Sequence, residues 1–441
     1  MFSSIGSHTI LGLKVYLILA MISAGFAGFL FGVNTGNIAG ALPFITQQMH
    51  TTLIQNECLV ASTILCAALS ALINVRMSRK YGLRKVLLFT GVCFLVGAFI
   101  AGISDSFYAL LLGRAVLGFA IGISSFTAPL YIADIAPTEY RGFFVLLNGL
   151  AITSGEAVAF YVDYHYSASG QWRVMIMWSI VPALIFLTCM FFMPCAPRWH
   201  LAQGRDRLAH RLLKSLHSEK TAKMLLNDMK VIQKEPVIAL RSFLRQKQYR
   251  TPLMIGLGLG IFQQFFGINT IMYYGPFIFE KAGFPLTSTA IWATFIMGVF
   301  NIFTTMVTAL LVDIIGRRKL LLLGSCIAWV SLLSIAYLFY DDMGTIQSYC
   351  ILLLMIMYMI GYCMSVGSLF WLMIAEIFPL SMKERGASIA TSVQWFSNFI
   401  VSFTFLSLLN RWGASATFFI YSTVCCTAMF FVYYFIPETK N

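Results

Sequence analysis

The sequence predicts an all-α membrane protein of twelve transmembrane helices, arranged as two pseudo-symmetric halves of six helices each. Apolar residues make up 59% of the 441 positions and charged residues only 11%, whereas a soluble domain carries about 25% charged residues. Twelve apolar segments are each long enough to cross a bilayer core, which requires about 20 helical residues. A polar stretch at about 194–250 separates the first six segments from the last six.

The predicted spans follow the apolar runs in chain order. They cover about 12–44, 54–75, 85–104, 107–130, 143–163, 174–193, 251–279, 287–312, 318–340, 347–375, 385–409 and 413–435. We therefore expect an N-terminal six-helix half over 1–193, a cytoplasmic linker over 194–250 and a C-terminal six-helix half over 251–441. The linker has an amphipathic stretch at 206–226 that predicts short helices, and a solvated linker without helices is the alternative.

The basic residues collect on one side of the predicted topology. The net charge is +13, yet the side opposite the two termini holds only Arg173, Lys281 and Arg411, and Arg114 lies within a span. Because Lys and Arg accumulate in cytoplasmic loops, both termini and the linker are expected in the cytoplasm, with the protein in a plasma or inner membrane. This bias accounts for the basic composition, so nucleic-acid binding is not expected.

Two motifs occur once in each half at nearly the same spacing. Ile132–Gly142 is echoed by Ile374–Pro379 together with Arg385-Gly386, and Tyr81–Lys85 is echoed by Ile315–Lys319. Two unrelated motif pairs with almost one offset indicate a duplication of a six-helix unit. Duplicated halves with a binding site between them are typical of secondary transporters that work by alternating access.

The seventh predicted span carries an unusual set of polar side chains. Gln263 and Gln264 are adjacent, Asn269 follows within two helical turns, and Tyr273 and Tyr274 come next. An unpaired amide in hydrocarbon is costly, so these side chains should face a partner or a water-filled cavity. Neutral amides beside aromatic rings suit an uncharged ligand with many hydroxyl groups.

Other function classes lack support in the sequence. The ten cysteines lie mostly in apolar runs without metal-ligand spacing, and the six histidines lie near loops or helix ends. No nucleophile–base set and no nucleotide-binding loop is present, so neither enzymatic activity nor a cofactor or metal is expected. Energy for transport would come from a solute or proton gradient, and we expect the protein to function as a monomer in the lipid bilayer.

An ordered series of motifs resembles the sugar porter family of the major facilitator superfamily over nearly the whole chain. The resemblance implies the twelve-helix fold of that superfamily. The motifs are Gly32–Gly36, Arg114, Tyr131–Gly142, Pro197–Trp199, Gln263-Gln264 with Asn269, Asn301, Asp313 with Gly316–Arg318, Trp371, Glu376, Gln394-Trp395 with Asn398, and Pro437–Lys440.

The resemblance implies a monosaccharide site between the halves. Its hydrogen-bonding residues in the C-terminal half would be Gln263, Gln264, Asn269 and Asn301, with Trp371, Gln394 and Trp395 as walls or ligands. For any single amide the alternative is an interhelical hydrogen bond. For either tryptophan the alternative is ordinary packing.

The resemblance also implies a charge network at the cytoplasmic helix ends, which holds the two halves together in one state of the cycle. These gating residues would be Asp134, Arg141, Glu376, Arg385, Arg317 and Arg84. For the arginines, the alternative is the ordinary excess of positive charge on the cytoplasmic side.

Departures from the family pattern concern proton coupling. Proton-coupled members carry an Asp in the first span where this chain has Asn34, and an amide does not exchange a proton near neutral pH. Facilitative members carry Asn there, which favours a uniporter. In the fifth span, Gly149 and Glu156 replace two glutamines of the family, and a carboxylate at membrane depth is usually functional.

Glu156 therefore has three interpretations. It acts as the proton carrier in place of the missing Asp, as a permanently ionised pair with Arg114, or as a direct hydrogen-bond acceptor for the sugar. The coupling candidates are Glu156, Arg114 and Asn34.

The tenth span lacks the prolines that the family places beside its Gly and Trp, here Gly367 and Trp371. Proline removes a backbone hydrogen bond and kinks a helix. The absence of these prolines predicts a more regular tenth helix.

The leading hypothesis is transport of a hexose or pentose by alternating access, coupled to protons through Glu156 and Arg114. The alternatives are a facilitative uniporter, a transporter of a polyol or another small solute, and a transporter-like sugar sensor. Sensors of this type carry long signalling tails, and the sequence ends at Asn441 directly after the last span, so sensing is the least expected.

Overall fold

The structure is a computed structural model of the chain that describes residues 9–10, 13–136, 138–233, 246–284, 287–340, 344–379 and 383–438. Within these ranges, the side chains of residues 9–10, 13–14, 138–146, 231–233, 247, 313, 375 and 383–384 are not described. The side chain of Arg141, one of the expected gating residues, therefore lies outside the described part.

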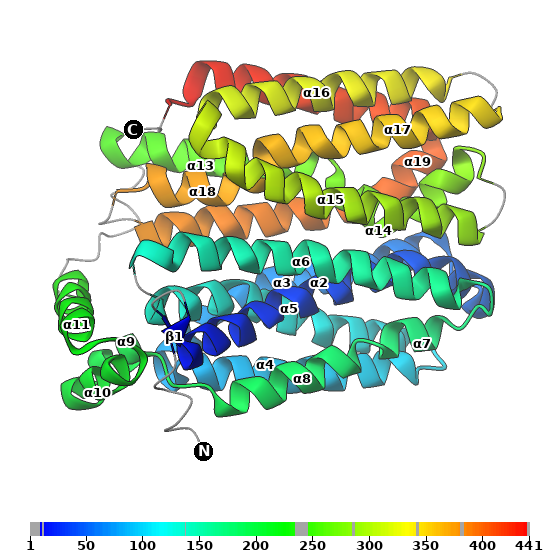
Figure 1. Cartoon of the computed structure of the whole chain (residues 1–441). Coiled ribbons are helices and arrows are strands. Elements are labelled where there is room, and N and C mark those ends of the chain that lie inside the picture. Colours follow the sequence, from blue (N-terminus) through cyan, green and yellow to red (C-terminus); the bar gives the residue numbers. More distant parts are fainter. Residues whose placement is uncertain are drawn as a thin grey trace.

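The N-terminal half (the N-half) begins with a short antiparallel hairpin, β1 (Thr9–Ile10) and β2 (Leu13–Lys14). Long helices follow, and α7 and α8 together form the sixth span. They are α2 (Val15–Met49), α3 (Leu53–Tyr81), α4 (Leu83–Gly102), α5 (Phe107–Ile135), α6 (Thr138–Ser167), α7 (Trp172–Met177) and α8 (Ile180–Phe192). These helices lie side by side in the lower part of the molecule in Figure 1.

The C-terminal half (the C-half) lies above the N-half in Figure 1 and packs against it mainly through α6 and α3. Its seventh and tenth spans are each built from more than one helical piece. The elements are α13 (Lys247–Phe265), α14 (Ile268–Lys281), α15 (Thr287–Ile315), α16 (Arg317–Leu338), α17 (Thr345–Tyr362), the π-helix η1 (Cys363–Gly367), α18 (Ser368–Ile377) and α19 (Lys383–Phe435).

The described helices account for the twelve predicted spans. Ten stretches are long and apolar enough to cross a membrane. The 30-residue helix α6 is not among them, but it lies inside the bundle against α2 and α15. The last stretch, Arg385–Phe435, holds two spans, because Gly413 breaks α19 with a φ of 80°. The fold is the all-helical membrane architecture that the sequence predicts.

The described part of the linker forms three short helices at the membrane face that also carries the described chain ends (the terminal face; Figure 1). They are α9 (Pro197–Ala202), α10 (Asp206–Leu216) and α11 (Glu219–Gln233). Apolar side chains from all three, such as Leu201, Leu213 and Leu225, form a small core of their own. A hydrogen bond from Lys214, at 2.8 Å, lowers the pKa of the exposed carboxyl of Glu219 and fixes α10 to α11.

Close packing of α2 against α6 depends on glycine. A Cβ atom on Gly32 would lie 1.9 Å from the carbonyl oxygen of Ile152, a distance that real Cβ atoms do not adopt. By contrast, a Cβ atom on Gly25, two turns earlier in α2, would meet no atom within 4 Å. The two glycines thus share one helix but differ in their surroundings.

We expect Gly32→Ala to destabilise the protein by about 1–3 kcal/mol, because the added methyl group must push two backbones apart. Gly25→Ala is the matched control and should be neutral or slightly stabilising, since alanine favours the helix more than glycine. Thermal unfolding of both purified variants in detergent checks the prediction. Equal unfolding temperatures would show that the helix contact is not as tight as the structure has it.

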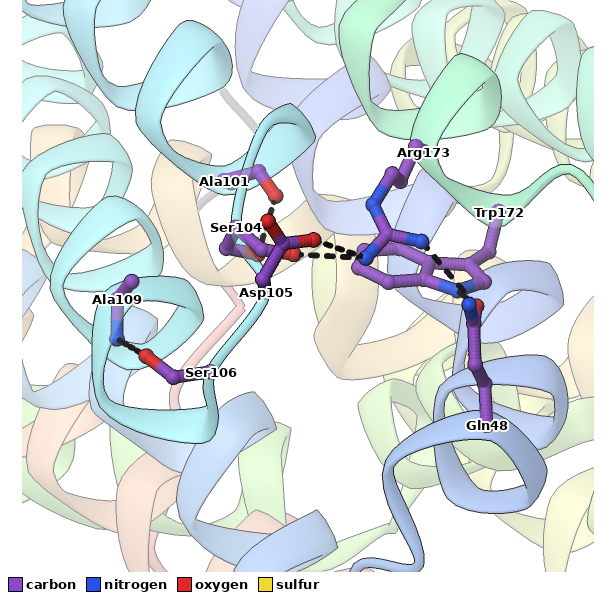
Figure 2. A network of polar contacts seen from close by, with 8 residues as sticks. All are labelled: Gln48, Ala101, Ser104, Asp105, Ser106, Ala109, Trp172 and Arg173. Carbon is purple, nitrogen blue, oxygen red and sulfur yellow. Dashed lines mark hydrogen bonds and ion pairs between the residues drawn. The ribbon is translucent and has the colours of Figure 1, made fainter.

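Polar contacts (Figure 2) join three elements of the N-half at the membrane face opposite the termini, where α7 begins (the opposite face; Figure 1). Gln48 of α2 accepts hydrogen bonds from the Trp172 indole at 2.5 Å and from Arg173 at 3.2 Å. Arg173 also donates to the Ser104 carbonyl at 3.0 Å and pairs with Asp105 at 2.9 Å. These contacts tie the ends of α2, α4 and α7 at the opposite face into one unit.

The prediction of a regular tenth span is wrong. Residues Cys363–Gly367 form a π-helix, and Ser365 has non-helical torsion angles of φ −106° and ψ −122°. Just before the π-helix, Gly361 packs so closely on α16 that its Cβ atom would lie 2.6 Å from the backbone nitrogen of Ala328. Proline is one cause of a helix irregularity, but a π-bulge is another.

Candidate functional site

The seventh span is broken between the glutamine pair and Asn269. Gly267 has a φ of 88°, a left-handed conformation that glycine adopts at little cost, and it separates α13 from α14. Gln263 and Gln264 lie at the end of α13, and Asn269 lies in the first turn of α14. The break brings the Asn269 amide within 2.6 Å of the Gln264 side-chain oxygen.

The three amides form a chain of hydrogen bonds that ends in the tenth span. Asn269 donates to Gln264 at 2.6 Å, Gln264 donates to Gln263 at 3.4 Å, and Gln263 donates to the Gly367 carbonyl at 2.9 Å. Gln263 and Gln264 are buried. The sequence left open whether these amides bind a ligand or join helices. Here they join α13 and α14 to the π-helix, and they keep acceptor and donor capacity that a ligand could take over.

Gln394 and Trp395 are consecutive residues of α19 in the eleventh span, and Gln394 packs beside Gly260 of α13, one turn before Gln263. Both are buried, and the Gln394 Oε1 and Trp395 Nε1 atoms lack a hydrogen-bond partner among the residues that the structure describes. Buried polar atoms are nearly always bonded to protein or water. The ring of Phe31 from α2 lies 5.7 Å from the Trp395 ring. Buried polar atoms without partners on two consecutive residues, one of them beside an aromatic ring, suit a ligand that supplies hydroxyl groups.

Glu156 of α6 lies where the two halves meet. Its carboxylate accepts long hydrogen bonds from the Thr35 hydroxyl of α2 and from the Asn301 amide of α15, each at 3.5 Å. Asn301 in turn accepts from the Cys363 thiol of the π-helix at 3.2 Å. Glu156 is 9% exposed and belongs to none of the ion pairs found among the described residues. A buried carboxylate thus contacts neutral groups of both halves.

The expected ion pair between Arg114 and Glu156 is absent from this structure. Arg114 is fully buried and donates to the carbonyl oxygens of Asn34, at 2.9 Å, and Leu59, at 3.3 Å. The physical reason is the position of α2, which packs against both α5 and α6. Arg114 reaches the backbone of α2 from one side, and Glu156 reaches Thr35 of the same helix from the other.

Asn34 and its neighbour Asn37 are buried amides of the first span. Asn34 donates to the Leu30 carbonyl at 2.8 Å, and its side-chain oxygen lacks a partner in the described part of the chain. The side-chain nitrogen and oxygen of Asn37 also lack a hydrogen-bond partner in the described part of the chain. Asn37, Thr35 and Cys363 were not singled out from the sequence. Asn37 lies one turn beyond Asn34 on the same helix, and that spacing could have indicated it.

Trp371 differs from the other candidates. It lies in α18, is 46% exposed, and contacts Phe370 with ring centroids 5.0 Å apart. The structure therefore brings Gln263, Gln264 and Asn269 together in one chain and places Gln394 and Trp395 side by side. Trp371 is not enclosed with them in this conformation.

The predicted gating residues with described side chains lie at the terminal face. Asp134 pairs with Arg198 of α9 at 3.2 Å, and Arg317 pairs with Glu376 at 3.0 Å. Arg84 donates to the carbonyl oxygens of Met190, at 3.4 Å, and Phe191. Arg385 is exposed.

Comparison with known proteins gives matches along nearly the whole chain. The Sugar (and other) transporter family matches residues 20–441. The galactose-proton symporter of Escherichia coli (strain K12) is 34% identical over 420 residues, covering 95% of this chain and 90% of that protein. The arabinose-proton symporter of the same strain is 35% identical over 426 residues with the same coverage. The D-xylose transporter of Levilactobacillus brevis is 34% identical over 432 residues, covering 95% and 94%.

Solved structures of the xylose transporter XylE from E. coli share the fold. Its partially occluded inward-open conformation has a TM-score of 0.85 at 26% identity and covers 97% of this chain and 99% of that chain. Its complex with 6-bromo-6-deoxy-D-glucose has a TM-score of 0.80 at 26% identity and covers 96% and 97%. These matches establish that the chain is a multi-pass membrane transporter that belongs to the sugar porter family of the major facilitator superfamily.

Proposed function

We propose that the protein moves a monosaccharide, a hexose or a pentose, across the membrane together with a proton by alternating access. The observation that carries this proposal is Glu156, a buried carboxylate at the junction of the halves that contacts Thr35 and Asn301 but no cation among the described residues. The named relatives that are proton symporters for galactose and arabinose support the same reading.

The sugar site would lie between α13–α14, the π-helix and α19. Neutral amides supply donors and acceptors for hydroxyl groups, and the Trp395 and Phe31 rings supply flat apolar surface for sugar C–H groups. The unpartnered atoms of Gln394 and Trp395 are the clearest sign that a polar ligand completes this region. No charged group of the C-half is needed for such a ligand.

Glu156 would carry the proton in place of the Asp that Asn34 replaces. An ionised carboxylate without a counter-charge is costly inside a membrane, whereas its protonated form is not. Because Asn301 of the C-half contacts this carboxylate, a change in its charge would alter an interaction between the two halves. That is the physical link between proton binding and the transport cycle.

Facilitated uniport is the second candidate, and Asn34 is the observation that favours it. The proton-carrying Asp of coupled family members is an amide here, and its nitrogen is already committed to the Leu30 carbonyl. Under this alternative, Glu156 would accept a hydrogen bond from the sugar and would not exchange its proton during the cycle.

We further propose that the terminal face is cytoplasmic. The linker helices and both described chain ends lie there (Figure 1). The sequence places most Lys and Arg residues on this side, which is the orientation that the positive-inside rule predicts. The N-half, the linker and the C-half would then correspond to residues 1–193, 194–250 and 251–441.

Uptake into proteoliposomes tests the proposed function. Purified protein is reconstituted and given a panel of labelled hexoses, pentoses and polyols, with and without an imposed inward proton gradient. We expect at least one monosaccharide to accumulate above its external concentration only when the gradient is present. Equal uptake with and without the gradient would favour the uniporter, and background uptake of all monosaccharides would contradict the proposal.

A further inference from the structure

A second glutamate of the N-half contacts the C-half, far from the proposed sugar site. Glu57 lies in the first two turns of α3, at the opposite face, and is 2% exposed. One carboxylate oxygen accepts from the Ser407 backbone N–H of α19 at 2.7 Å, and the other accepts from the Ser407 hydroxyl at 2.7 Å. Both oxygens of one carboxylate are thus bound by a single residue of the other half.

This contact is directional, unlike the neighbouring contacts between the halves. Tyr161 and Tyr164 of α6 meet Phe295 and Trp292 of α15 with ring centroids 5.6 Å and 4.8 Å apart, and each of these pairs includes a partly exposed ring. Aromatic contacts of this kind tolerate sliding, whereas two short hydrogen bonds to a carboxylate fix both distance and orientation.

At the opposite face, polar contacts within the N-half hold its helices together, so that they can move as a rigid unit. The network of Gln48, Trp172, Arg173 and Asp105 joins its helices to one another (Figure 2). The hydrogen bonds of Glu57, by contrast, join the N-half to α19 of the C-half. If the two halves separate at the opposite face during alternating access, the network can stay intact but the Glu57–Ser407 contact must break.

We infer that Glu57 and Ser407 form a latch that holds the opposite face closed. The structure resembles inward-open conformations of the XylE transporter, in which that face is the closed one. Release of the latch would accompany each opening toward the outer solution. The inference rests on alternating access, but it does not depend on which solute is carried or on proton coupling.

Distance measurements between spin labels test the latch directly. Labels are placed at Tyr108→Cys in the N-half and Ile346→Cys in the C-half, in a background in which the native cysteines are replaced. Both positions begin helices at the opposite face and are 78% and 81% exposed. Without substrate, we expect mainly one short distance, with a small longer-distance fraction from the outward-open state.

In Glu57→Gln, we expect the ratio of the longer to the shorter population to rise about tenfold, because a hydrogen bond to a charged group is lost and the new amide N–H₂ group faces a donor. Ser407→Ala removes only the hydroxyl donor and should give a smaller rise. Glu280→Gln is the matched control, since Glu280 accepts from Thr287 within the C-half at 3.0 Å.

An unchanged ratio of the longer to the shorter population in both Glu57→Gln and Ser407→Ala would overturn the latch. An equal shift in Glu280→Gln would also overturn it, because the effect would then be a general response to lost charge at this face. The spin-label distances are measured without substrate, so the result in each variant does not depend on sugar uptake. A protein that fails to transport any monosaccharide but shows the expected shifts would retain the latch and lose the proposed function.

Discussion

Glu156→Gln should abolish sugar accumulation driven by a proton gradient while leaving sugar exchange across the membrane in place. Glutamine keeps nearly the same shape and can still contact Thr35 and Asn301, but it cannot bind and release a proton near neutral pH. We expect gradient-driven accumulation to fall at least about tenfold, to the level of passive equilibration. Accumulation and counterflow of the best substrate in proteoliposomes, measured on the same preparations, check this prediction.

Asp163→Asn is the matched control for this variant. Asp163 is another buried carboxylate of α6, two turns nearer the opposite face, and it accepts from the Gly40 backbone N–H at 3.1 Å within the N-half. The Asp163→Asn variant should therefore still accumulate sugar in response to the proton gradient. Loss of accumulation in Asp163→Asn, but not in Glu156→Gln, would show that Asp163 and not Glu156 carries the proton.

Gln263→Ala should weaken sugar binding by about ten- to a hundredfold, because a site built to hydrogen-bond a ligand loses most when its buried polar groups are left unpaired. The substitution also frees the Gly367 carbonyl of the π-helix, which Gln263 bonds at 2.9 Å. The apparent affinity for the transported sugar, from counterflow or from binding to purified protein, is the quantity to measure.

Asn37→Ala provides the comparison from the N-half. Its side chain is buried and its polar atoms have no partner in the described residues, so it is the amide of that half with the most free hydrogen-bonding capacity. We expect its effect to be smaller than that of Gln263→Ala, since the C-half supplies the chain of amides. Equal losses in the two variants would show that both halves share the neutral sugar contacts.

Features that depend only on residues close together in the sequence could be predicted from it. Amides in an apolar span must find partners, and Gln264 and Asn269 do so across the break at Gly267. The twelve spans followed from hydrophobic length alone. In these cases the physical requirement is visible in a short stretch of residues.

Contacts that depend on helix order could not be predicted in this way. The pairing of Glu156 with Asn301, and not with Arg114, depends on α2 lying between α5 and α6, which no local pattern reveals. The π-helix in the tenth span is another example, since it lies beside the close contact of Gly361 with Ala328 of α16, which depends on how the helices pack. Glu57 and Ser407 are 350 residues apart and carry no motif.

Sugar-driven proton movement tests most directly whether Glu156 carries the proton. An external pH electrode records alkalinisation when the transported sugar is added to lightly buffered proteoliposomes that contain wild-type protein, Glu156→Gln or Asp163→Asn. We expect alkalinisation with the wild type and with Asp163→Asn, and none with Glu156→Gln, although that variant still exchanges sugar. Undiminished alkalinisation with Glu156→Gln would contradict Glu156 as the proton carrier.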